Sequence, residues 1–442
     1  MKSRMAIAAM VLAAAGTWAG SANNEYLRTA KDAARWIDST AVLSEDGNGV
    51  VWPADPGDPK SVNSRLYSGT PGPILFFLEA YRYTRETHYL NAAQKGADAL
   101  LGAMKKEDPT GLYEGLAGTG FTLGEVYLFT KNKKYLDGAL QCVDWLKARA
   151  KPVGRGLEWD SGNDIIAGGA GTGLFLLWAN KELKAPAAHN LAVQAGERLV
   201  DLAQSKGSGK TSWVMKTDSK YGEMPNFSHG TAGVAYFLTT LYIETKRKEF
   251  LDAGIAGANY LKSIANTEGQ ICLIYHDDKH KDLYYLSWCH GPAGVARLFY
   301  QLYRATEDPQ WMDWMKRSAK AMIVQGAPKA VVTPGEWNNV SMCCGVSAQA
   351  QFFLDMYQVT RDRQFLDLAR NGTDQLLRVA KRDATGARWV QAEHRVKPDL
   401  LIAQTGYMQG ASGVGMWLLH MSAFAEGRKM PILTFPDNPF PY

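Results

Sequence analysis

A pair of glycines separated by two residues recurs seven times along this sequence, each time at the start of an apolar run. One copy is His-Gly-Pro-Ala-Gly at 290–294, and the sixth copy has Ala348 in place of the second glycine. The first glycines of the seven copies are Gly69, Gly115, Gly168, Gly230, Gly291, Gly345 and Gly410. They lie 46, 53, 62, 61, 54 and 65 residues apart. A period of this length fits one pair of helices with its loops in each repeat.

Each repeat has two different helical patterns. The run after the glycines is apolar on nearly all sides, as at 234–238, which is typical of a buried helix. Most second halves open with an aromatic residue, then Leu or Met, then Asp or Asn, and continue with apolar residues every three or four positions. This is the amphipathic pattern of a half-exposed helix. The openings are Tyr89-Leu90-Asn91, Tyr135-Leu136-Asp137, Phe250-Leu251-Asp252, Trp311-Met312-Asp313 and Phe365-Leu366-Asp367.

Seven such pairs predict an all-α fold, an α/α toroid (barrel) of seven helical hairpins with the apolar helices inside. An open solenoid is the alternative, but it would need polar capping repeats, and the sequence shows none. We therefore expect one toroid domain over 23–430, with 23–64 leading in. A proline-rich C-terminal tail follows at 431–442.

Residues 1–22 have the pattern of a secretory signal peptide. Lys2 and Arg4 precede an uncharged apolar run at 5–15, and small residues at 20–22 allow cleavage after Ala22. An uncleaved anchor is the alternative. We expect an exported protein, periplasmic or extracellular, with no stable membrane insertion after cleavage.

Charge gives little indication of a nucleic-acid partner. The sequence holds 49 Lys and Arg against 44 Asp and Glu, and removal of Lys2 and Arg4 leaves 47 − 44 = +3. A balance this weak and dispersed does not predict nucleic-acid binding. The sequence does not indicate an oligomeric state.

In a closed ring, the N-termini of the inner helices would meet at one mouth. Free backbone N–H groups and partial positive charge gather at helix N-termini, where they favour thiolates and other anions. The residues directly before the first glycines should line this mouth, and they are Ser68, Glu114, Ala167, His229, His290, Cys344 and Gln409. Cys289 and Cys343 lie one position earlier, and Asp164 precedes Gly168 by four.

Three of the five cysteines fall at matching positions of adjacent repeats. Cys289, Cys343 and Cys344 offer three soft ligands with a fourth position open, which is typical of a catalytic zinc site. His290 is a rival fourth ligand. The alternatives are buried thiols or a disulfide, either Cys343–Cys344 or Cys289–Cys343. Cys142 and Cys272 lie in apolar stretches and are interpreted as buried thiols or as a disulfide pair.

Three segments resemble the lanthionine synthetase C-like family. They read Ser-His-Gly-Thr-Ala-Gly at 228–233, Trp-Cys-His-Gly-Pro-Ala-Gly at 288–294 and Cys-Cys-Gly at 343–345, and Leu-Tyr-Ser-Gly at 66–69 is similar too. The resemblance covers all seven repeats and implies the same toroid fold.

The resemblance also implies a chemistry. One Zn²⁺ would be bound by Cys289, Cys343 and Cys344, and it would hold a substrate thiolate. That thiolate adds to a dehydroalanine or dehydrobutyrine and forms a thioether. His229 would assist proton transfer, and Asp164 would support the site.

Two positions depart from the family pattern. Cys344 stands where the family has a ligand histidine, so that three thiolates would give the zinc site a charge of +2 − 3 = −1. Tyr285 stands where the family has an arginine, which removes a positive charge suited to a developing enolate. Tyr285 or His290 would have to offer a hydrogen bond instead.

The leading hypothesis is thus a zinc enzyme that activates a thiol of a peptide or small molecule. A second hypothesis is a carbohydrate-active toroid enzyme that uses the carboxylates of Glu114 and Asp164. Its sugar-stacking surfaces would be Trp52, Trp159 and Trp288. A third is a non-catalytic protein that binds a peptide or zinc.

Overall fold

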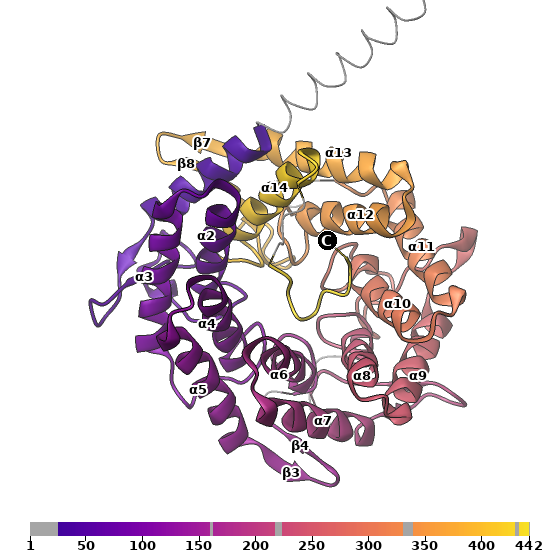
Figure 1. The fold of residues 1–442 in the computed structure, drawn as a ribbon. Coiled ribbons are helices and arrows are strands. Elements are labelled where there is room, and N and C mark those ends of the chain that lie inside the picture. The colour runs from indigo at the N-terminus through magenta and orange to yellow at the C-terminus, as the bar shows by residue number, and fades with distance from the viewer. Residues whose placement is uncertain (1–24, 160–161, 217–222, 330–338, 429–432, 442) are drawn as a thin grey trace, which may run out of the picture.

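The computed structural model describes residues 25–159, 162–216, 223–329, 339–428 and 433–441. Over these ranges the chain forms two concentric rings of helices (Figure 1). The predicted α/α toroid is confirmed. The predicted signal peptide at 1–22 lies outside the described residues.

The inner ring is formed by the helices that follow the glycine pairs. They are α2 (Pro71–Thr84), α4 (Leu116–Thr130), α6 (Gly169–Leu183), α8 (Thr231–Thr245), α10 (Pro292–Thr306), α12 (Val346–Thr360) and α14 (Ala411–Ala425). Each packs against the next, and α14 packs against α2, so that the ring is closed. An open solenoid would leave its two end helices apart, so the closed architecture prevails over that alternative.

The outer ring covers the inner one. Six of its helices follow their inner partners along the chain: α3 (Thr87–Ala103), α5 (Lys133–Arg149), α7 (Pro186–Asp201), α9 (Lys248–Ile264), α11 (Pro309–Val324) and α13 (Arg363–Val379). The inner helix α8 is buried on nearly all sides, whereas α9 buries a stripe of Phe250, Gly254, Gly257 and Leu261. These are the two patterns that the sequence predicts for inner and outer helices.

The seventh outer helix comes from the N-terminal part of the chain. Residues 25–39 are helical and lie between α13 and α3 (Figure 1). The Tyr26 hydroxyl donates to Asp374 of α13 over 2.8 Å, and Lys31 pairs with Glu86 at the start of α3. The segment predicted as a lead-in therefore completes the outer ring.

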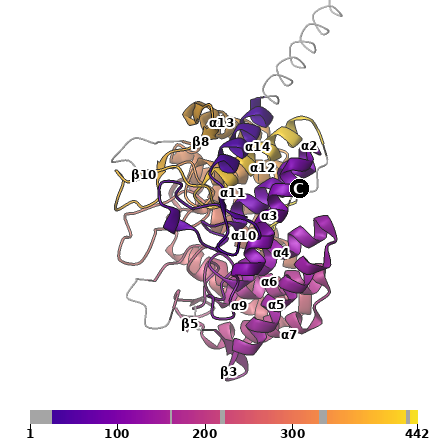
Figure 2. The ribbon, with the colours of Figure 1, turned by 90° about the vertical axis from the view of Figure 1, so that its left-hand side faces the viewer.

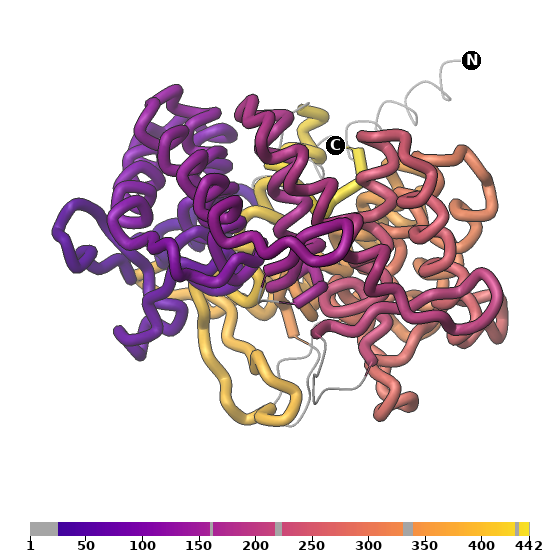
Figure 3. The backbone as a smooth tube through the Cα atoms, turned by 90° about the horizontal axis from the view of Figure 1, so that it is seen from below, coloured from indigo at the N-terminus to yellow at the C-terminus, as the bar shows by residue number. Residues whose placement is uncertain are grey.

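Short strands and turns connect the helices. Among the described residues, antiparallel pairs are formed by β1 (Val42–Leu43) with β2 (Val50–Val51), β3 (Lys151–Val153) with β4 (Gly156–Glu158), β5 (Gln204–Ser205) with β6 (Thr211–Ser212), β7 (Lys381–Asp383) with β8 (Gly386–Arg388), and β9 (Gln391–Ala392) with β10 (Leu401–Ile402). The same residues include the 3₁₀ turns η1 (Pro59–Ser61) and η2 (Glu268–Gln270). The side view shows connecting loops gathered on one face of the ring (Figure 2), and the segment between α13 and α14 extends beyond it (Figure 3).

In five of the seven copies the second glycine allows close packing of the preceding chain onto the helix start. A Cβ at Gly233 would lie 2.1 Å from the carbonyl oxygen of Phe227, and one at Gly294 would lie 1.9 Å from that of Trp288. Both clashes involve the carbonyl six residues earlier, because the segment before the helix folds back over its first turn. The recurring glycine is therefore a packing requirement of the fold.

The segments that lead into the inner helices, here called the glycine loops, are joined by a cycle of backbone hydrogen bonds. Each link runs from the N–H of one loop to a carbonyl of another. The seven links are Tyr67→Tyr113, Tyr113→Ile166, Ile165→Ser228, Ser228→Cys289, Cys289→Cys343, Cys343→Met408 and Met408→Tyr67. The cycle fixes the loops side by side and so fixes the residues that line the mouth of the ring.

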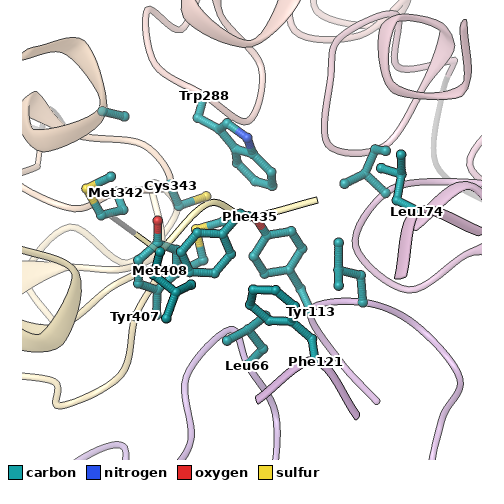
Figure 4. Close-up of a cluster of buried hydrophobic side chains, with 14 of the residues drawn as sticks. Leu66, Tyr113, Phe121, Leu174, Trp288, Met342, Cys343, Tyr407, Met408 and Phe435 are labelled. Atoms are coloured by element: carbon teal, nitrogen blue, oxygen red, sulfur yellow. The ribbon is translucent and has the colours of Figure 1, made fainter. Parts of the chain in front are cut away.

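The centre of the ring is filled by the C-terminal segment. Figure 4 shows Phe435 among side chains from several inner helices and glycine loops, including Tyr113, Trp288 and Tyr407. The Phe435 ring stacks on Tyr407 with centroids 4.4 Å apart. Leu433, Phe435, Asp437 and Phe440 are buried, so the segment predicted to be a C-terminal tail packs into the core of the domain.

A buried carboxylate holds this segment in place. Asp437 accepts hydrogen bonds from the Trp288 indole at 3.0 Å, Arg297 at 3.0 Å and the Tyr113 hydroxyl at 3.1 Å. Trp288 directly precedes Cys289, so the C-terminal segment supports the glycine loop that carries that cysteine. In the part of the chain that is described, no helix is both long and apolar enough to cross a membrane.

Candidate metal and proton-transfer site

Three sulfur atoms meet where the glycine loops before α10 and α12 lie side by side. Cys289 Sγ is 3.2 Å from Cys344 Sγ, which is 3.1 Å from Cys343 Sγ, and all three lie within 4.8 Å of one another. Cys289 and Cys343 are buried, and Cys344 is partly exposed. The link from Cys289 N–H to the Cys343 carbonyl, 3.1 Å long, places the two loops in this register.

These residues fit a zinc ion by the chemistry of their donors. Three thiolates with one open position match the ligand number of a catalytic zinc site. All five cysteines are free, so neither the Cys343–Cys344 nor the Cys289–Cys343 alternative is formed, and Cys142 and Cys272 are separate buried thiols rather than a pair. His290, the proposed rival ligand, does not join the group of three sulfurs.

The three thiols do not ionise alike. Burial raises the pKa of the Cys343 thiol, but hydrogen bonds from Cys289, Cys344 and Tyr67 outweigh it and hold that pKa well below its usual value. Burial and Cys343 raise the pKa of Cys289. Cys343 is therefore the first of the three to carry negative charge.

Tyr67 and Gln409 support Cys343 from neighbouring glycine loops. The Tyr67 hydroxyl donates to Cys343 Sγ over 3.2 Å, and Gln409 Nε2 donates to the Tyr67 hydroxyl over 2.9 Å. Sequence reasoning placed Gln409 at the mouth but missed Tyr67, although Tyr67 stands in the Leu-Tyr-Ser-Gly segment at 66–69.

His229 and Asp164 form a tight pair beside the thiols. His229 Nδ1 lies 2.6 Å from Asp164 Oδ2, and Asp164 Oδ1 accepts from the backbone N–H of Ala167 over 2.9 Å. Burial lowers the pKa of His229. The hydrogen bond to Asp164 and the negative charge of that residue have a larger effect in the opposite direction, so the pKa of His229 lies above its usual value. The pair leaves Nε2 of His229 as the ring nitrogen that can exchange a proton with a substrate.

Two further histidines lie next to His229. The His290 ring is 5.6 Å from the His229 ring and 4.1 Å from the His276 ring, between centroids. His290 is buried, and burial followed by the charges of its two neighbours lowers its pKa well below the usual value. His276 was not predicted. Its only sequence signal is a polar His-Asp-Asp-Lys-His run at 276–280.

Tyr285 contacts an arginine from a distant part of the chain. Arg395, in the hairpin between β9 and β10, donates from Nε to the Tyr285 hydroxyl over 3.1 Å. Burial raises the pKa of Tyr285 to about 12, so its hydroxyl keeps its proton. Arg395 was missed because it lies outside the repeat pattern.

A single pocket of about 590 Å³ gathers these groups at the mouth of the ring. Four of the seven residues predicted to line the mouth do so: Glu114, His229, His290 and Cys344. Cys289, Cys343, Tyr67, His276, Tyr285 and the hairpin residues 393–396 complete most of its wall. Asp164 reaches the pocket through His229.

The carbohydrate hypothesis loses its proposed stacking surfaces. Trp52, Trp159 and Trp288 are all buried, and none of them lines this pocket. The indole of Trp159 donates to the Leu146 carbonyl, and that of Trp288 donates to Asp437. These tryptophans are core residues, and the prediction that they stack on sugars is wrong.

The fold and this pocket define an α/α-toroid protein with a thiol cluster at the N-termini of its inner helices. The Lanthionine synthetase C-like protein family matches residues 60–431, and the chain belongs to this family.

Solved structures share the architecture. Nisin cyclase is similar with a TM-score of 0.60 at 15% identity, over 83% of this chain and 89% of that one. A UGL variant with dGlcA-Glc-Rha-Glc has a TM-score of 0.50 at 14% identity, over 95% of this chain and 98% of the other. At these identities the likeness concerns the fold.

Proposed function

We propose that this protein joins a thiol to an electron-poor alkene, such as a dehydroalanine or dehydrobutyrine, to form a thioether. The observation that carries the proposal is the meeting of Cys289, Cys343 and Cys344 in one pocket with the Asp-bound ring of His229. The substrate would be a peptide or a small thiol. Membership of the Lanthionine synthetase C-like family supports this class of reaction.

Cys289, Cys343 and Cys344 would together hold one Zn²⁺. When bound, this ion lowers the pKa of a substrate thiol and fixes the position of its sulfur. Tyr67 would orient Cys343 through its 3.2 Å hydrogen bond, and the backbone link between Cys289 and Cys343 would hold the two loops in register. The ligands would thus all lie on the hydrogen-bonded glycine loops and not on the hairpin between β9 and β10.

His229 would donate a proton to the carbon that becomes C–H in the product. Asp164 binds Nδ1 of the ring, so that Nε2 would be the nitrogen that faces the substrate. The raised pKa of His229 suits a proton donor near neutral pH. This assignment accounts for the buried Asp164, whose side chain is only 2% exposed.

Arg395 would supply the positive charge that Tyr285 does not. Arg395 lines the pocket and its guanidinium lies beside the Tyr285 hydroxyl, and three thiolates with a bound Zn²⁺ would give this pocket a net charge of −1. A fixed cation there favours a carbonyl oxygen on which negative charge develops during the addition. The hairpin would thereby compensate for the substitution in the glycine loop.

The test is a turnover assay with defined reagents. Zinc-loaded protein is mixed with N-acetylcysteine methyl ester and N-acetyldehydroalanine methyl ester, and thioether is measured by mass spectrometry. We expect turnover that Cys289→Ala abolishes and that Cys272→Ala retains, because Cys272 is a buried thiol outside the pocket. Equal rates for wild type and Cys289→Ala would contradict the proposal.

Export is also proposed, on the pattern of residues 1–22 alone. N-terminal sequencing of protein recovered outside the cytoplasm should begin at Asn23. Recovery only from the cytoplasm with residues 1–22 intact would contradict it.

A further inference from the structure

The pocket contains a second Asp–His pair that the proposed mechanism does not use. His276 Nδ1 lies 2.6 Å from Asp277 Oδ2, the same atoms and distance as in the pair of His229 and Asp164. Asp277 is buried and also accepts backbone N–H groups of Lys279 and His280 through Oδ1. Its carboxylate is therefore fixed, and it fixes the His276 ring with Nε2 as the remaining nitrogen.

Both pairs lie next to His290. His276 stacks on His290 with ring centroids 4.1 Å apart, and the His229 ring lies 5.6 Å from the His290 ring. His290 itself is buried, and its Nδ1 has no hydrogen-bond partner among the described residues. Two aspartate-bound rings, those of His276 and His229, thus lie next to His290, and both line the pocket of the thiols.

Addition of a thiol to an alkene requires two proton transfers at different atoms. The S–H bond breaks and releases a proton, while the sulfur electron pair forms the S–C bond. The π electrons of the alkene then take a proton at carbon. Because one proton is released and one is consumed, the reaction is balanced without a further reactant, but a single imidazole cannot face both atoms at once.

We infer that His276 is the second proton-transfer residue of this pocket, with Asp277 as its positioning residue. His276 Nε2 accepts the proton of the substrate thiol, and His229 Nε2–H gives its proton to carbon. Both rings then recover their starting state by exchange with water, because the pocket opens to solvent. This role rests on the proposed function.

The surroundings of the two rings support this division. Burial lowers the pKa of His276, and the hydrogen bond that its Nδ1 donates to Asp277 only partly offsets this effect, so that the ring is neutral near pH 7. The titratable and charged groups facing it are Asp277, His280, Tyr285, His290 and Arg395. Two groups whose pKa values are moved in opposite directions are the usual arrangement of a base and an acid.

The kinetic test compares His276→Gln with His280→Gln. Both histidines bind Asp277 through Nδ1, but His280 is exposed and does not line the pocket. With the two probe esters above, we expect His276→Gln to lower kcat by about 10²–10⁴-fold with little change in KM. His280→Gln should stay within about twofold of wild type. Asp277→Asn should lower kcat and alter the pH profile. An unchanged kcat and pH profile in His276→Gln would overturn the inference.

A second measurement separates this inference from the proposed function. Imidazole ¹⁵N spectra of zinc-loaded protein are recorded with and without N-acetylcysteine methyl ester, and His276 is assigned by its loss in His276→Gln. We expect the ¹⁵Nε2 resonance of His276 to shift when the thiol binds, because that nitrogen accepts a hydrogen bond from the thiol before the proton is transferred. Binding of the thiol, seen by calorimetry, without a change at His276 overturns the role of His276 alone. Absence of thiol binding overturns the proposed function and this role together.

Discussion

The backbone N–H of Cys289 donates a 3.1 Å hydrogen bond to the carbonyl oxygen of Cys343, which lies 54 residues further along the chain. This bond is one link of the cycle that joins the glycine loops around the ring. Because this hydrogen bond holds the backbones of Cys289 and Cys343 side by side, the sulfur atoms of both residues lie close to that of Cys344. The site is therefore a product of the packing of consecutive repeats and not of one continuous segment of the chain.

The pairing of His229 with Asp164 predicts a pH dependence. If His229 acts as an acid, kcat falls as the pH rises through its raised pKa. Asp164→Asn removes the hydrogen bond that raises this pKa, so the alkaline limb of the profile should move to lower pH. The profile of kcat against pH for the two proteins checks this.

The same pair affects stability, and the sign follows from the direction of the shift. The pKa of His229 is higher in the folded protein than in the unfolded chain, where it is about 6.5. The resulting stabilisation is complete at a pH below the unfolded pKa, and it is lost as the pH rises through the folded pKa. Asp164→Asn should thus lose more stability at pH 5.5 than at pH 9 in chemical denaturation. An equal loss at both values would contradict a charged His229.

The glycine pair predicts a sharp difference between neighbouring positions. In Gly233→Ala the new methyl would lie 2.1 Å from the Phe227 carbonyl oxygen and 2.5 Å from Ile165, so we expect destabilisation by about 1–3 kcal/mol or more. Gly169→Ala is the matched control, because the nearest atom to its Cβ is 3.8 Å away at the start of another inner helix. Urea titration of both variants measures the difference. Equal stability would mean that the second glycine has another role.

The C-terminal segment predicts a link between the core and the metal site. Asp437→Asn breaks a buried ion pair, in which the side chain of Asp437 is 1% exposed and that of Arg297 is 11% exposed. We expect the free energy of unfolding to fall by about 3–5 kcal/mol. Zinc affinity should fall as well, because Asp437 also holds the indole of Trp288 next to Cys289. Asp137→Asn is the control, since its exposed pair with Lys133 contributes about 0.3–0.5 kcal/mol. Unchanged stability in Asp437→Asn would contradict a structural role for the segment.

The ring of helices was predictable from the sequence because each repeat carries the same glycine pair and the same helical patterns. The glycine pairs mark the starts of the inner helices, and a closed ring then brings Cys289, Cys343 and His229 to one mouth. The helix at 25–39 was missed because its inner partner, α14, lies at the other end of the chain. The burial of Phe435 was missed because a short proline-rich segment has no periodic pattern.

Two of the missed residues of the pocket come from segments outside the repeat pattern. His276 lies in a turn between α9 and α10, and Arg395 lies in the hairpin between β9 and β10. Neither has a fixed distance from a glycine pair, so their places in the pocket depend on loop conformation. The residues predicted from the repeats precede the inner helices at fixed positions, whereas these two residues do not.

The most direct test of the account is the zinc content of the purified protein. Elemental analysis should find about one zinc per chain in wild type and in Cys272→Ala, and none in Cys343→Ala, with folding checked by circular dichroism. That result would place the metal on the three thiols of the glycine loops. Zinc absent from folded wild type, or retained at one per chain in Cys343→Ala, would contradict the thiol site on which the proposed function rests.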